Sequence, residues 1–169
     1  METWDAIRAR RNVRAYTDQK ISEADLARIA EAGWRAPSAS NSQPWDFIVC
    51  TDRDLLRQLA TTWTGAGHLA TSAATIVLVA PDDEAHRPII EYDLGQATMN
   101  LMLTAADLGI GSGHAAIGDK DKAGELLGLP AGKVASYFIA LGYPSERPLK
   151  PIAKPTRRPI DEVVHHNHW

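Results

Sequence analysis

The sequence lacks the features that mark several large classes of protein. Cys50 is its only cysteine, so an internal disulfide is impossible and a cysteine-based zinc cluster has no ligand set. The longest apolar run, residues 73–81, is far too short to cross a bilayer, which needs about 20 residues. The acidic start, followed by basic residues from Arg8 to Arg14, is unlike a secretory signal. These absences predict a soluble, unprocessed protein of a reducing cytoplasm that does not bind membranes.

A strong excess of charge of either sign is also missing. The 169 residues carry 18 Lys and Arg against 21 Asp and Glu, which gives a formal net charge of −3. This balance provides no general attraction to nucleic acid, so any anion site must be local. The length and the 44% hydrophobic content suit one globular domain over residues 1–169 and exclude a multidomain enzyme.

Helical and strand patterns alternate along the chain. A capping box at residues 22–25 predicts a helix that ends at Pro37, and the apolar, β-branched residues 75–80 predict a strand buried on both faces. Polar, turn-rich residues predict loops at 37–44 and 61–68. The other expected helices lie around Trp4 and Ile7, after Asp52, at 88–108 and at 119–128, and the other expected strands at 45–51, after Gly109 and at 134–141.

The order of these elements favours an α+β fold, a small mixed sheet with helices packed on it, over a doubly wound α/β fold. Only the middle of the chain has the strand, helix, strand rhythm of a parallel sheet. The helix at 88–108 is apolar nearly all round, which predicts packing on several sides. The segment from Tyr143 holds five of the ten prolines and should form an extended arm.

Several familiar catalytic patterns are missing or incomplete. There is no Gly-x-Ser-x-Gly elbow and no phosphate-binding Gly-Lys-Ser/Thr loop, and Cys50 lies in an apolar strand, where it is interpreted as a core residue. The glycines at 109, 111 and 113 follow a helix instead of a strand, so they do not form a dinucleotide fingerprint. The histidines at 165, 166 and 168 have no acidic or cysteine partners, and we expect no metal site.

Basic residues gather near both ends of the chain. Three arginines, at 10, 11 and 14, lie within five residues, and Lys154, Arg157 and Arg158 lie in the arm. Guanidinium groups suit a phosphate ester because they offer charge and paired donors together. A solvated surface is the alternative interpretation of such clusters.

The sequence resembles the nitroreductase family of FMN enzymes over nearly its whole length and in the expected order. The most specific match is Pro-Ser-x-x-Asn-x-Gln-Pro-Trp, with a basic block upstream of it. The matching blocks are Arg10–Tyr16, Ala36–Trp45, Asp93–Met102, Leu108–Ser112, Leu127–Pro130, Ala140–Pro144 and Arg158–His165.

The resemblance implies an α+β fold with a mostly antiparallel sheet flanked by helices. It also implies a homodimer that exchanges its extended C-terminal arms and holds FMN at the subunit interface. NAD(P)H would reduce the flavin, and a small electron-poor acceptor such as a nitroaromatic or a quinone would then reoxidise it in a ping-pong cycle. The proline-rich arm and the all-round apolar helix agree with this picture, since both need a partner surface, and a phosphate pocket formed from both ends of the chain explains the arginines.

The resemblance also assigns site residues, position by position. The block that holds the flavin phosphate and the pyrimidine side of the ring corresponds to Arg10, Arg11, Asn12 and Arg14, and either Arg157 or Arg158, with Arg157 favoured, would complete the phosphate clamp. The loop that reaches the flavin from the partner subunit corresponds to Pro37, Ser38, Ala39, Ser40, Asn41 and Gln43. The strand that covers the ring and offers it a backbone N–H corresponds to Gly113, His114, Ala115 and Ala116.

Departures from the family pattern leave the substrate open. Small side chains surround His114 at residues 113–116, which predicts a roomier and more polar pocket, and residues 61–87 are too few for a helical lid. His114 and His68 are candidates for orienting or protonating the acceptor, because histidine titrates near neutral pH. For each, a ring that only bonds nearby backbone is the alternative. Enones, halogenated phenols, a deazaflavin donor and a non-catalytic flavin-storage or sensing role also remain open.

Overall fold

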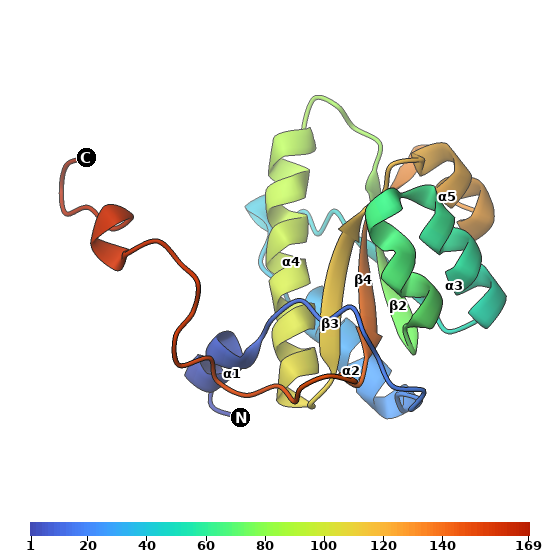
Figure 1. The fold of residues 1–169 in the computed structure, drawn as a ribbon. Helices are drawn as coiled ribbons and strands as arrows, with labels where there is room; N and C mark the ends of the chain where they lie inside the picture. Colours follow the sequence, from blue (N-terminus) through green and yellow to red (C-terminus); the bar gives the residue numbers. More distant parts are fainter.

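The computed structural model describes residues 1–169 as a four-stranded antiparallel sheet flanked by helices (Figure 1). The strands lie in the order β1-β2-β4-β3, and every neighbouring pair is antiparallel. Their bounds are β1 Asp46–Cys50, β2 Ala74–Pro81, β3 Gly111–Ala116 and β4 Lys133–Gly142. The predicted α+β class is confirmed, and the one parallel pairing is an isolated bridge between Asn12 and Ser112.

Helices cover both faces of the sheet. Their bounds are α1 Thr3–Ala9, α2 Glu23–Trp34, α3 Arg53–Leu59, α4 Arg87–Asp107 and α5 Lys120–Leu127, with short 3₁₀ turns at Ala39–Asn41, Ala60–Thr62, Thr64–Thr71 and Ile160–Glu162. In β2, Ile76 and Leu78 pack with α2 and α4, whereas Val77 packs on the other side with α3 and α5. This alternation along a strand buried on both faces divides the core into two layers.

Side-chain caps begin α2, α3 and α5 where the sequence predicts them. Ser22 Oγ accepts a hydrogen bond from Asp25 N at 3.0 Å, and Asp52 Oδ1 accepts one from Leu55 N at 2.8 Å. Asp119 Oδ1 caps α5 through Lys122 N at 3.0 Å. Each cap satisfies a backbone N–H that has no partner within its helix.

Residues 61–68, expected as a loop, form 3₁₀ turns instead. Their local hydrogen bonds, such as Ala66 N to Trp63 O at 3.0 Å, are compatible with the small side chains of this segment. Leu69 lies just after them and is fully buried in the core layer beside α3. Burial of this leucine therefore fixes a stretch that looks like a free loop in sequence.

The long helix α4 packs on several sides, as its apolar sequence predicts, against the sheet, α1 and α2. One side stays open, because Ile89 and Tyr92 are 50% and 72% exposed and Met99 is 39% exposed. Trp4 and Ile7 of α1 are also exposed. One protomer thus leaves an apolar surface uncovered over α1 and α4. No helix is both long and apolar enough to cross a membrane.

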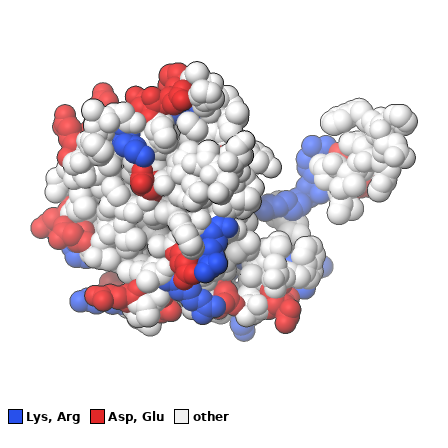
Figure 2. All heavy atoms as spheres, turned by 180° about the vertical axis from the view of Figure 1, so that it is seen from behind, with Lys and Arg blue, Asp and Glu red and all other residues white.

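The C-terminal arm leaves the body after β4, as the proline pattern predicts. Every residue from 150 to 169 is exposed, and the arm forms a separate lobe beside the protein (Figures 1 and 2). Two backbone hydrogen bonds hold its start to the body, Thr17 N to Tyr143 O at 2.8 Å and Ser145 N to Ala15 O at 3.1 Å. Beyond residue 149, its one backbone hydrogen bond to the body joins Ile152 N to Arg8 O at 3.0 Å. The arm carries exposed Ile160 and Val163, so it adds to the uncovered apolar surface.

Candidate functional site

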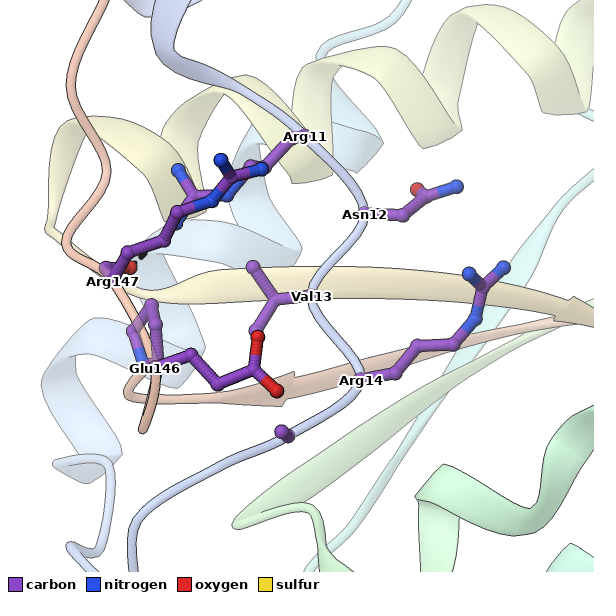
Figure 3. Close-up of a pocket in the computed structure, with 8 residues that line it drawn as sticks. Arg11, Asn12, Val13, Arg14, Glu146 and Arg147 are labelled. Carbon is purple, nitrogen blue, oxygen red and sulfur yellow. Dashed lines mark hydrogen bonds between the residues drawn. The ribbon is translucent and has the colours of Figure 1, made fainter.

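The basic segment after α1 runs in an extended conformation beside β3. Val13 N donates to Ser112 O at 2.9 Å, and Tyr16 bridges to Pro144 at the start of the arm. Side chains of an extended chain point alternately to opposite sides. Figure 3 shows the result: Asn12 and Arg14 point to one side of the segment, and Arg11 points to the other.

The segment lies so close to β3 that the strand needs glycine there. A Cβ on Gly113 would lie 2.4 Å from the Val13 carbonyl oxygen, and a Cβ on Gly111 would lie 2.8 Å from Val13 Cβ. The Tyr16 hydroxyl donates to the same Val13 carbonyl at 2.6 Å. Burial raises the pKa of Tyr16 well above its usual value, so the hydroxyl keeps its proton and this donated bond.

Arg10 and Arg14 carry charges that no carboxylate in the protomer neutralises. Neither makes an ion pair or a side-chain hydrogen bond within the chain. Arg157 also makes no ion pair and bonds only the Thr156 carbonyl oxygen. Arg10 lines a cavity of about 890 Å³ together with Arg157 and Arg158, which Trp4 and Met99 help to enclose. Unpaired guanidinium groups beside such a space are suited to bind an anion.

Arg11 lines one cavity together with Asn12 and Arg14, but its side chain points away from theirs. Its guanidinium donates to the carbonyl oxygens of Arg147 and Pro148, the latter at 3.3 Å, on the opposite side of the segment from Arg14 (Figure 3). Partial burial, and then the charge of Arg147, lower the pKa of Arg11. The alternation of the extended chain thus turns the Arg11 side chain away from those of Asn12 and Arg14, and Arg11 holds the start of the arm.

The two candidate histidines lie close to Arg14 but in different environments. His114 is exposed on β3, with Nδ1 3.3 Å from Asn12 Oδ1. His68 is buried, and its Nε2 lies 3.3 Å from the Gly113 carbonyl oxygen. Burial lowers the pKa of His68, and the charges of Arg14 and His114 lower it further, so the ring is neutral at neutral pH. This placement favours the structural alternative for His68 and leaves His114 facing solvent.

The polar loop at residues 37–43 is exposed but has a defined shape. Three of its residues, Ser40, Asn41 and Gln43, have positive φ angles of 51°, 56° and 49°. Such backbone strain in non-glycine residues concentrates at functional sites. The loop meets the rest of the protomer at Asp93 of α4, a buried carboxylate to which the sequence analysis assigned no role.

One protomer does not bring the loop and the arginines together. Asn41 and Gln43 line a separate hollow with Trp34 and Arg35, and no residue of the loop lines the cavity that holds Arg10. No hydrogen bond joins the loop to residues 10–16. Asn12, Arg14 and His114 form one group, Arg10, Arg157 and Arg158 form a second, and the loop is a third.

Comparison with known proteins gives one consistent result. The family model described as the nitroreductase family matches residues 7–66 and 61–143. A protein of Archaeoglobus fulgidus, provisionally named NADH dehydrogenase/NAD(P)H nitroreductase, is 34% identical over an alignment that covers 96% of both chains. The FMN-dependent nitroreductase of Clostridium difficile R20291 has a TM-score of 0.83 at 26% identity, covering 97% of this chain and 98% of its own. The NADPH:FMN oxidoreductase of Vibrio harveyi, solved with NAD⁺, has a TM-score of 0.84 at 26% identity, covering 97% of this chain and 76% of its own.

The contact between Val13 and β3 can be tested with Gly113→Ala. Because the added Cβ would meet a backbone oxygen, the basic segment must move, and we expect a loss of about 1–3 kcal/mol in the free energy of unfolding. Urea unfolding of the flavin-free protein measures it. The matched control is Gly124→Ala in α5, where a Cβ meets nothing within 4 Å. Equal stability of Gly113→Ala and the parent would contradict the close packing.

Proposed function

Because this chain belongs to the nitroreductase family, we propose that it is an oxidoreductase that passes hydride from NAD(P)H, through bound FMN, to a small electron-poor acceptor such as a nitroaromatic or a quinone. Two unpaired arginines carry the proposal: Arg14, which points to the same side as Asn12 near His114 of β3, and Arg10, in the cavity that it shares with the arm. They provide a local cationic site in a chain whose net charge is negative.

The residues present fit the phosphate and the ring of FMN. Arg14 and Asn12 point to the same side, and Arg10 lines a cavity with Arg157, so unpaired cations near both ends of the chain are available to a phosphate ester. Arg158 lines the same cavity but is paired with Glu162 at 3.4 Å. Next to Asn12, the exposed face of β3 carries the His114 ring and the small side chain of Ala116. Bound FMN would supply the hydride chemistry, and the protein supplies position and electrostatics.

The backbone of β3, the edge strand of the sheet, offers a donor along its free edge. Val13 N bonds Ser112 O, so the backbone groups of Ser112 point away from β4. Backbone groups of successive strand residues alternate between the two edges. The next outward N–H is therefore that of His114, and we assign it as the donor to the flavin ring.

A homodimer would complete the site and cover the apolar surface. The loop at 37–43 lies apart from the arginines of its own protomer, and we propose that it reaches the flavin site of the partner. The arm at 150–169 and the exposed residues of α1 and α4 would then pack against the second copy. Exposed apolar patches of this kind mark protein interfaces.

The absorbance spectrum of the purified protein, followed by NAD(P)H oxidation with a quinone or nitro acceptor, tests the proposed function. Flavin bands and rapid turnover are expected. Flavin bands without oxidation of either nicotinamide by any acceptor would favour the storage or sensing alternative. A protein that binds no FMN would contradict the proposal. Activity that appears only with a reduced deazaflavin, or with enones or halogenated phenols as acceptors, would correct the donor or the acceptor class.

The phosphate assignment predicts that Arg14→Ala weakens FMN binding. A charge-assisted hydrogen bond contributes about 1.5–3 kcal/mol, which corresponds to a Kd raised about 10- to 100-fold. Quenching of flavin fluorescence measures the Kd. The control is Arg28→Ala, which removes an exposed arginine paired with Asp107 and should leave the Kd unchanged. The assignment is wrong if both variants bind FMN like the parent.

If the arm packs against the second copy, formation of the homodimer depends on residues 150–169. Deleting them removes only exposed residues and the bond from Ile152 N to Arg8 O, so the protomer itself should stay folded. We expect a monomer with little bound flavin, as measured by size-exclusion chromatography with light scattering and by absorbance. A stable yellow dimer of the shortened chain would contradict arm exchange.

His114 is the exposed titratable group on this face of β3. If its side chain orients or protonates the acceptor, His114→Ala should slow reoxidation of the flavin about 100-fold while reduction by NAD(P)H stays nearly unchanged. Stopped-flow absorbance separates the two half-reactions. Equal reoxidation rates across several acceptors would show that the side chain only lines the wall.

A further inference from the structure

The loop at 37–43 keeps its shape through its own hydrogen bonds. Ser38 Oγ accepts from Gln43 N at 2.9 Å, and Asn41 N donates to Ser38 O at 3.0 Å. Gln43 Nε2 donates back to Asn41 O at 3.2 Å. These bonds hold three residues in the left-handed region at a cost of about 1–3 kcal/mol each. They define the form of the loop but do not attach it to the protein.

Two side chains of α4 make the hydrogen bonds that attach the loop. Both carboxylate oxygens of Asp93 accept from Ala39 N, at 3.2 and 3.1 Å. Gln96 Nε2 bonds the Pro37 carbonyl at 3.3 Å and Asp93 Oδ1 at 3.2 Å. No other residue outside the loop forms a hydrogen bond with residues 37–43, apart from Trp45, which follows it in the chain.

Asp93 is an unusual residue to find in this place. It is 1% exposed, and no Lys, Arg or His forms an ion pair with it. Burying a carboxylate without a cation is costly unless hydrogen bonds compensate. The Ala39 amide and the Gln96 side chain donate the compensating hydrogen bonds to Asp93. Because Ala39 belongs to the loop, the buried carboxylate is stabilised only while the loop stays in this position.

We propose that Asp93 is a positioning residue that fixes the loop at 37–43, and thereby the part of the flavin site that one protomer supplies to its partner. The inference rests on the proposed function, because it takes FMN as the ligand and a homodimer as the assembly. Asp93 itself does not face the ligand: its carboxylate is buried behind the loop and acts through Ala39. A loop fixed in its binding conformation avoids the cost of ordering when the ligand binds.

Two substitutions of Asp93 distinguish a role as hydrogen-bond acceptor from a role in packing alone. Asp93→Ala leaves the Ala39 N–H without its partner, whereas Asp93→Asn keeps one acceptor oxygen. We expect the FMN Kd to rise about 10-fold or more for the alanine variant and less for the asparagine variant. Hydrogen exchange at Ala39 should speed up in the same order. Asp121→Asn, an exposed carboxylate of α5, is the control and should change neither quantity.

Mixed dimers test whether the effect crosses the interface. Arg14→Ala and Asp93→Ala chains are co-expressed with different tags, and the dimers that carry both tags are isolated. A symmetric dimer has two equivalent sites. In the mixed dimer, one site would combine both defects, and the other would combine the intact Arg14 of one chain with the intact loop of its partner. We expect about one tightly bound FMN in each mixed dimer, and weak binding in either parental homodimer.

The outcomes separate this inference from the proposed function. A wild-type chain that binds no FMN contradicts the proposed function. A wild-type chain that binds FMN, together with an Asp93→Ala chain of equal Kd, overturns the role of Asp93. Mixed dimers with no tight site also overturn it, because Asp93 would then act within its own protomer. If Asp93→Ala does not fold, Asp93→Asn takes its place in the mixed dimers, and the same outcomes decide.

Discussion

The close approach of residues 10–16 to β3 is the contact on which the candidate site depends. Two glycines at 111 and 113 leave the space that Val13 occupies, and the Val13 amide bonds Ser112. Once Val13 is held against the strand, the alternation of an extended chain determines the direction of its neighbours. Arg14 then faces the exposed surface beside His114, and Arg11 faces the arm. The two glycines of β3 therefore determine the position of Arg14 and, through Arg11, the position of the start of the arm.

The protomer is complete in its core and incomplete at its surface. Both layers around β2 and β4 are filled by helices, and no buried side-chain polar atom lacks a partner. Outside that core, apolar residues of α1, α4 and the arm lie exposed, the arginines at 10 and 14 have no carboxylate, and a strained loop projects into solvent. The proposed homodimer would address both features. The second copy would cover the exposed apolar residues, and its loop would complete the site that contains the unpaired arginines.

Features with a short-range cause could be predicted from the sequence, and those with a long-range cause could not. Capping residues such as Ser22 and Asp119 bond amides three residues away, so local patterns reveal them. The Asp93 carboxylate bonds an amide 54 residues earlier in the chain, and its type alone suggests an exposed helix position. The resemblance groups Arg11 with Asn12 and Arg14 as one block, and a block match carries no information on the direction of each side chain. The structure shows an extended segment, in which Arg11 points to the side opposite Asn12 and Arg14.

The way in which Arg11 holds the arm has a consequence for sequence variation. Its guanidinium binds the main-chain oxygens of Arg147 and Pro148, not their side chains. Every amino acid presents that oxygen, proline included. The side chains at 147 and 148 can therefore change without loss of the hydrogen bonds that direct the chain away from β4. Among homologous chains, identity at these two positions should matter less than an arginine at 11, and the path of the arm should persist where its sequence has diverged.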